Sequence, residues 1–119
     1  MAHTVSAQKI EPDTCQPPAD YENVAVTKIF NDSLNSTFVI WVKREVKPHK
    51  HAHHTECITV LDGEAEMTLG DTTFTIKKGD MVFIPAGTVH SVKVTSKKSL
   101  KVVSTQSPHF DGSDRVFVE

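Results

Sequence analysis

Several features that mark large classes of protein are scarce in this sequence. It has only two cysteines, Cys15 and Cys57, which cannot build a disulfide framework. No apolar run approaches the ~20 residues of a membrane-spanning helix, so we expect no membrane partner. The 13 Lys and Arg against 15 Asp and Glu give a net charge of −2, which argues against a nucleic-acid partner. The N-terminus has no apolar stretch behind a basic start, which predicts a cytoplasmic protein without a signal peptide.

The length and composition indicate one globular domain with an N-terminal extension. At 119 residues and 38% hydrophobic content, the chain is long enough for one core. Residues 1–22 contain Pro12, Pro17 and Pro18, few apolar residues and no periodicity. We therefore interpret residues 1–22 as an arm that lies on the domain or on a partner, and residues 23–119 as the domain itself.

The rest of the chain alternates between short apolar or β-branched runs and turn residues. Asp62-Gly63 is a hairpin-type turn signal, and Gly70-Asp71 marks the next turn. No segment shows the periodicity of a helix of three turns. Many short strands at nearly even spacing predict an all-β sandwich or barrel. The predicted strands are residues 24–30, 37–42, 57–61, 64–69, 72–76, 81–84, 90–94, 100–103 and 116–118.

A histidine-rich segment, Pro48 to Glu56, is the clearest candidate site. It holds four of the seven histidines and ends in a carboxylate. Imidazole and carboxylate are ligands of divalent Fe, Mn, Ni and Zn. Histidines two residues apart on a strand leave the same face, which fits either His49 with His51 or His51 with His53. A further histidine, His90, shares a predicted strand face with valines, so it is expected to point inward and to need a partner.

Two segments carry residues at defined spacing. The first is His49-x-His51, four residues, Glu56, six residues and Gly63; the second is Gly79, five residues, Pro85-x-Gly87, two residues and His90. Over residues 43–94, these segments resemble the two motifs of the cupin superfamily. The interval between them is short, as in small single-domain microbial cupins. Two positions differ from the family pattern: Lys43 replaces a glycine and Val94 replaces an asparagine.

The resemblance implies a double-stranded β-helix, or jelly-roll, that holds one divalent transition metal ion (Fe, Mn, Ni or Zn). By position, the implied metal ligands are His49, His51, Glu56 and His90. The alternative pair, His51 with His53, would leave only two residues before the glutamate, so the resemblance favours the first pair. His54 is then directed at the pocket mouth, where it and Glu56 are candidate catalytic groups for proton transfer.

Three classes of function follow from this ligand set. Four protein ligands leave two positions of a six-coordinate ion for a small molecule, which suits a metal-dependent dioxygenase, isomerase or lyase acting on an oxygen-bearing substrate. A binding or sensing module would hold a small-molecule ligand without converting it. A purely structural metal site is least expected, because such sites are usually closed and rich in cysteine. An exposed barrel edge and the arm also predict a homodimer formed by strand pairing.

Overall fold

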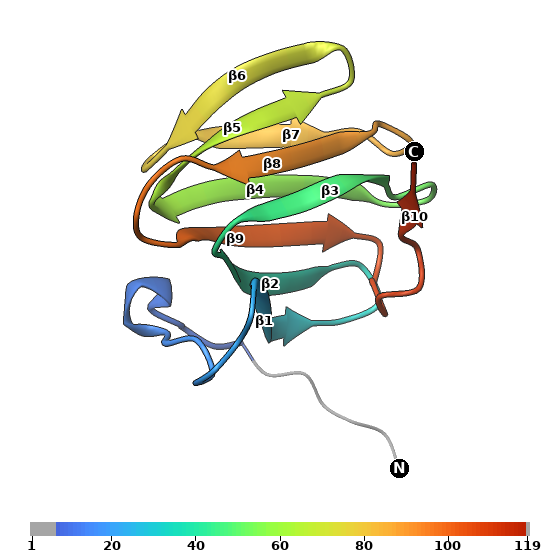
Figure 1. The fold of residues 1–119 in the computed structure, drawn as a ribbon. Coiled ribbons are helices and arrows are strands. Elements are labelled where there is room, and N and C mark those ends of the chain that lie inside the picture. Colours follow the sequence, from blue (N-terminus) through green and yellow to red (C-terminus); the bar gives the residue numbers. More distant parts are fainter. Residues whose placement is uncertain (1–6, 119) are drawn as a thin grey trace.

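The computed structural model describes residues 7–118, which form two facing five-stranded sheets (Figure 1). One short 3-10 helix, Pro12–Thr14, lies in the arm, and no helix of the described residues is long and apolar enough to cross a membrane. The predicted all-β jelly-roll is confirmed. The strands are β1 Val24–Asn31, β2 Ser36–Val42, β3 Glu45–Lys50, β4 Thr55–Asp62, β5 Glu64–Leu69, β6 Thr72–Lys77, β7 Met81–Ile84, β8 His90–Val94, β9 Leu100–Ser107 and β10 Val116–Phe117.

The chain passes repeatedly from one sheet to the other. The first sheet has the order β1-β2-β9-β4-β7 and the second β10-β3-β8-β5-β6, with antiparallel pairing throughout. Gly70 lies in the turn of the β5–β6 hairpin, as the sequence predicts. The hairpin predicted at Asp62-Gly63 is wrong. The chain does turn there, but β4 and β5 belong to different sheets, so Gly63 forms a corner between the sheets.

Strand β3 is absent from the strands that the sequence pattern predicts. It contains Pro48, and its pairing with β8 is irregular between Val46 and His49. Proline is tolerated in sheets mainly at edges and at such bulges. The bulge interrupts the alternation of apolar and polar residues, which explains why the sequence pattern does not reveal this strand.

Strand register divides the barrel interior into a polar end and an apolar end. Gln106 on β9 lies opposite Ser36 on β2 and Glu56 on β4, so three polar residues form one row. Four residues further along β9, Val102 lies between Ile40 and Val60 in an apolar row. The main core cluster surrounds the apolar end and comprises Val42, Ile58, Val60, Ala65, Met67, Ile76, Val82, Ile84, Leu100 and Val102.

The described part of the arm lies on the outer face of the first sheet. Val39 and Trp41 point away from the barrel interior, yet they are buried because Cys15 and Tyr21 pack in the same cluster. The Tyr21 hydroxyl also lies 2.7 Å from Ser99 Oγ. Cys15 and Tyr21 therefore cover apolar surface of the barrel, which is one of the two positions expected for the arm.

Candidate metal centre

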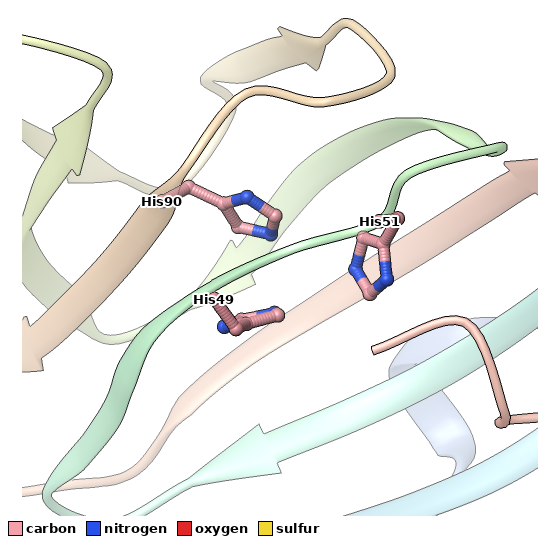
Figure 2. A group of neighbouring side chains, drawn as sticks. All are labelled: His49, His51 and His90. Carbon is pink, nitrogen blue, oxygen red and sulfur yellow. The ribbon is translucent and has the colours of Figure 1, made fainter. Parts of the chain in front are cut away.

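Two adjacent strands bring three histidines together. His49 lies on β3, His51 follows the end of that strand, and His90 is the first residue of β8. His49 and His90 are directly paired, with ring centroids 4.3 Å apart, and the His51 ring lies 5.1 and 5.3 Å from them. All three are buried, and each offers a nitrogen within 4.8 Å of the others (Figure 2). This arrangement is a compact cluster of imidazole donors.

Backbone carbonyls orient each imidazole through its Nδ1 atom. A carbonyl oxygen only accepts hydrogen bonds, so each Nδ1 carries a hydrogen. In the neutral ring Nε2 then holds the lone pair, as a metal ligand requires. The acceptors are the carbonyls of Lys47 for His49 (2.8 Å), Asp114 for His51 (2.7 Å) and Thr88 for His90 (3.0 Å).

Glu56 reaches the cluster from β4 of the opposite sheet. Its Oε1 lies 3.3 Å from His51 Nε2 and 3.2 Å from His90 Nε2. Its Oε2 accepts a hydrogen bond from Ser104 Oγ at 2.5 Å. Burial alone would raise the pKa of Glu56, but the contacts with His51, His90 and Ser104 hold that pKa well below its ordinary range. The glutamate is therefore an ionised donor beside the imidazoles.

The four side chains fit a divalent transition metal ion. His90 Nε2 is buried and, although Glu56 Oε1 lies 3.2 Å away, it makes no aligned hydrogen bond within residues 7–118, whereas buried polar atoms normally have one. An ion among the Nε2 atoms would satisfy it. Three neutral imidazoles and one carboxylate are suited to Fe, Mn, Ni or Zn alike. The donor set thus fits the predicted cofactor and leaves the choice of metal open.

The histidines differ in how readily they take up a proton. Burial, opposed by the Lys47 carbonyl, lowers the pKa of His49 to about 4. Burial also acts to lower the pKa of His51, but Glu56 and the Asp114 carbonyl outweigh it and raise that pKa above its ordinary value. Of these two predicted ligands, His51 is therefore the one whose proton would compete with a metal at the higher pH.

We expect metal affinity to fall on acidification. Only neutral imidazole binds a metal, so affinity is full above the raised pKa of His51 and falls about tenfold per pH unit below it. His49 adds a further loss near pH 4, where it too becomes protonated. Competition with a chelator of known affinity, between pH 8 and pH 5, measures this dependence. An affinity that stays constant over this range would contradict the assignment of His51 as a ligand.

The remaining histidines of the segment do not enter the cluster. His53 is exposed, and its backbone N–H donates to Asp114 Oδ2 at 2.7 Å. The His51–His53 alternative therefore has no support in the geometry. His54 does not line the cavity described below: its Nδ1 lies 2.6 Å from Asp114 Oδ2 and its Nε2 lies 2.8 Å from the His109 carbonyl. Both ring nitrogens are engaged there, so His54 connects to the C-terminal segment, and its catalytic role stays a prediction.

Asp114 is a residue of the candidate site that the sequence patterns do not reveal. Its carboxylate accepts hydrogen bonds from the N–H groups of Ala52 and His53, at 2.8 and 2.7 Å, and its carbonyl orients His51. The contact with His54 is the main cause that holds the pKa of Asp114 well below its usual range. The residue lies about sixty positions from these partners and belongs to no spaced motif, so only the fold identifies it.

We predict that Asp114→Ala weakens metal binding about 10–100-fold, the usual effect of removing a group that orients a ligand. The reason is that the His51 ring loses its fixed acceptor when the C-terminal segment is released. Asp111→Ala is the matched control, since the Asp111 carboxylate bonds only to Ser113 nearby. Metal titration of both variants measures the effect. Equal affinities for the two variants would contradict the role given to Asp114.

A cavity of about 330 Å³ lies beside the cluster, between the sheets. All four predicted ligands line it, together with Gln106 and the C-terminal residues Arg115 and Phe117. Its volume is within the range of small-molecule sites. The rest of the wall is mainly apolar and includes Val24, Val26, Ile40, Val42, Val46, Ile58, Met67, Ile84, Val92, Leu100 and Val102.

The sequence matches the cupin domain family over residues 36–105. The chain belongs to the cupin family. The two departures from the family motifs leave the fold intact. Lys43 has no positive φ, since Asp20 is the only non-glycine residue with one in the described part of the chain, and the Val94 N–H donates to the Arg44 carbonyl at 2.7 Å.

Similar proteins support the fold and leave the reaction open. An uncharacterised protein of Aquifex aeolicus is 38% identical over 98 residues, which are 82% of this chain and 80% of the relative. A Klebsiella pneumoniae protein with a double-stranded β-helix domain is 20% identical, with a TM-score of 0.80 over 96% of this chain and 99% of that chain. Pac13 of Streptomyces, described as a nucleoside dehydratase, is 16% identical, with a TM-score of 0.74 over 96% of this chain and 92% of that chain.

Proposed function

We propose that this cupin is a metal-dependent enzyme that acts on a small oxygen-bearing molecule in the barrel cavity. The observation that carries the proposal is that His49, His51, Glu56 and His90 all line a cavity large enough for a substrate. A purely structural metal site would be closed by protein on all sides. An ion at this position therefore remains within reach of a small molecule.

The protein residues would bind the ion and hold the substrate beside it. A bound ion supplies Lewis acidity, which polarises a substrate oxygen. Glu56 is the carboxylate buried among the donors, so its position makes it the candidate to accept a substrate proton, although its lowered pKa makes it a weak base there. The apolar wall would exclude water from the reacting group. Dioxygenase, isomerase and lyase reactions all suit this environment, and the dehydratase Pac13 is an example of a lyase reaction on the same fold.

The second candidate is a binding or sensing module that holds a small molecule without converting it. One observation favours it: His54 is engaged away from the cavity, which leaves Glu56, itself a proposed ligand, as the main candidate for proton transfer. A test for conversion of small molecules distinguishes the enzyme from the binding module. Metal-loaded protein would be incubated aerobically with mixtures of small hydroxy, keto and sugar compounds, followed by NMR. An enzyme consumes a compound, whereas a binding module returns every compound unchanged, including those it retains on gel filtration.

We also propose that two chains associate through β7. This strand is an edge of the first sheet, and Met81 and Phe83 on its outer face are 68% and 60% exposed. An edge strand with exposed apolar side chains is suited to pairing with a second copy. We expect a dimeric mass in light scattering at micromolar concentration and a monomeric mass for Phe83→Lys. Thr75→Lys, on the exposed polar face of edge strand β6, is the control that should stay dimeric. A monomeric wild-type protein would contradict the proposal.

A further inference from the structure

The side-chain oxygen of Gln106 is buried on the wall of the cavity and has no hydrogen-bond partner among the described residues. Gln106 as a whole is 3% exposed. It lies directly opposite Glu56 in the β4–β9 register, and residues in such pairs have side chains about 5 Å apart. A buried acceptor of this kind is costly unless something donates to it. A ligand hydroxyl beside the metal ligands would do so.

Arg115 supplies a positive charge to the same cavity. It lines the cavity and makes no ion pair among the described side chains. Its backbone is fixed on both sides. Asp114 is bonded to the histidine segment, and β10, which begins at Val116, pairs with β3 next to His49 (Figure 1). Arg115 is thus an exposed residue whose backbone is fixed at the cavity, and its side chain makes no ion pair with the described carboxylates.

With a divalent ion bound, the charges around the cavity would favour an anion. Arg115 and Lys47 contribute two positive charges to its lining, and Glu45 and Glu56 contribute two negative charges. When the histidines are neutral, these positive and negative charges cancel. A bound divalent ion would therefore give the site a net charge of about +2. The protein as a whole carries −2, so this local excess belongs to the site and not to the overall composition. A monoanionic or dianionic ligand would reduce it.

The opposite end of the cavity is hydrocarbon. In the row four residues from Gln106, Ile40 and Val102 line the cavity, and Val42 and Leu100, which pair with each other, line it beyond them. A fully hydrated ligand such as a free inorganic anion would leave this wall without contacts. A ligand with an aliphatic body would cover it.

We propose that the cavity binds a small aliphatic hydroxy acid, whose carboxylate is held by Arg115 and whose hydroxyl donates to Gln106 at the metal ligands. This inference deepens the proposed function and rests on it, because the polar end of the ligand is placed beside the metal. It makes Arg115 and Gln106 the residues that determine specificity. Neither belongs to the motifs that define the family resemblance.

Isothermal titration of the metal-loaded protein tests the proposal with three matched probes. They are 2-hydroxy-4-methylpentanoate, 4-methylpentane-1,2-diol, which lacks the carboxylate, and 4-methylpentanoate, which lacks the hydroxyl. We expect the hydroxy acid to bind at least tenfold more tightly than either analogue. Arg115→Gln should weaken the hydroxy acid about tenfold and leave the diol unchanged. Gln106→Leu should bring the hydroxy acid to the affinity of 4-methylpentanoate. Lys93→Gln, an exposed lysine away from the cavity, controls for a general change of charge.

Metal content and circular dichroism, measured on every sample, separate this inference from the proposed function. A wild-type protein that binds no metal would overturn both. A metal-loaded protein that binds the hydroxy acid no more tightly than the diol would overturn only the hydroxy-acid proposal. An Arg115→Gln variant that keeps its metal and binds the hydroxy acid as tightly as the wild type would also overturn the hydroxy-acid proposal.

Discussion

Replacing His90 by alanine should abolish metal binding while the barrel stays folded. We expect near one equivalent of metal in the wild-type protein purified without chelator, and less than a tenth of that in His90→Ala. The residue supplies one of four donors, and loss of a group that merely orients a ligand already costs 10–100-fold in affinity, so loss of a donor should cost at least ~100-fold. His49→Ala and Glu56→Ala should have the same effect, because these residues complete the same site.

His53→Ala is the matched control for this series. It removes an imidazole from the same segment, but the His53 side chain is exposed and lies outside the cluster. We expect it to retain a full equivalent of metal by elemental analysis. Circular dichroism and thermal unfolding in chelator would establish that all four variants remain folded. Loss of metal in His53→Ala with retention in His49→Ala would show that the ligand pair is shifted by two residues.

The part of the site that could be predicted from the sequence is the part built from local spacing. His49 and His51 lie close in sequence, and the resemblance to the cupin motifs predicts that Glu56 and His90 lie beside them. The structure brings these four side chains together. Strand geometry also predicts that Glu56 and its neighbour Cys57 face opposite sides, and Glu56 lines the cavity while Cys57 does not.

The residues that surround the predicted ligands could not be predicted from the sequence. They reach the site only through the register of the sheet and through the path of the C-terminal segment. Gln106 comes from the far end of β9, and Asp114 and Arg115 come from a C-terminal segment without a periodic pattern. The direction of His54 is a further example. Its neighbours in sequence suggest the pocket mouth, but acceptors at Asp114 and His109, both more than fifty residues away, determine where the ring lies. Spacing therefore predicts donors, whereas the residues that we propose for ligand specificity come from distant parts of the chain.

The turn signals at Gly63 and Gly70 look alike in the sequence, but distant residues give the two turns different roles in the fold. Both glycines follow a strand, and both have positive φ, +78° and +61°. Gly70 closes a hairpin within one sheet, so only its backbone angle matters. Gly63 lies where the chain passes to the other sheet, and the segment around Ser99 and Leu100 approaches it closely. A Cβ on Gly63 would lie 2.5 Å from the Ser99 carbonyl oxygen and 2.8 Å from Leu100 Cα, whereas on Gly70 the nearest atom is Thr88 Cγ2 at 4.0 Å.

We therefore expect Gly63→Ala to be far more destabilising than Gly70→Ala. The positive φ alone costs about 1–2 kcal/mol for an alanine, which is the full cost expected at Gly70. At Gly63 the clash is with backbone atoms that no rotamer change can move, so the free energy of unfolding should fall by ~4 kcal/mol or more, a large share of the stability of a small domain. Urea unfolding in chelator, which removes any contribution from bound metal, compares the two variants. If the two variants lose free energy of unfolding within about 1 kcal/mol of each other, the backbone around Ser99 and Leu100 can shift to accept the Cβ. A much larger cost at Gly63 would show that the first motif glycine is required because two sheets meet there, and not because a hairpin turns.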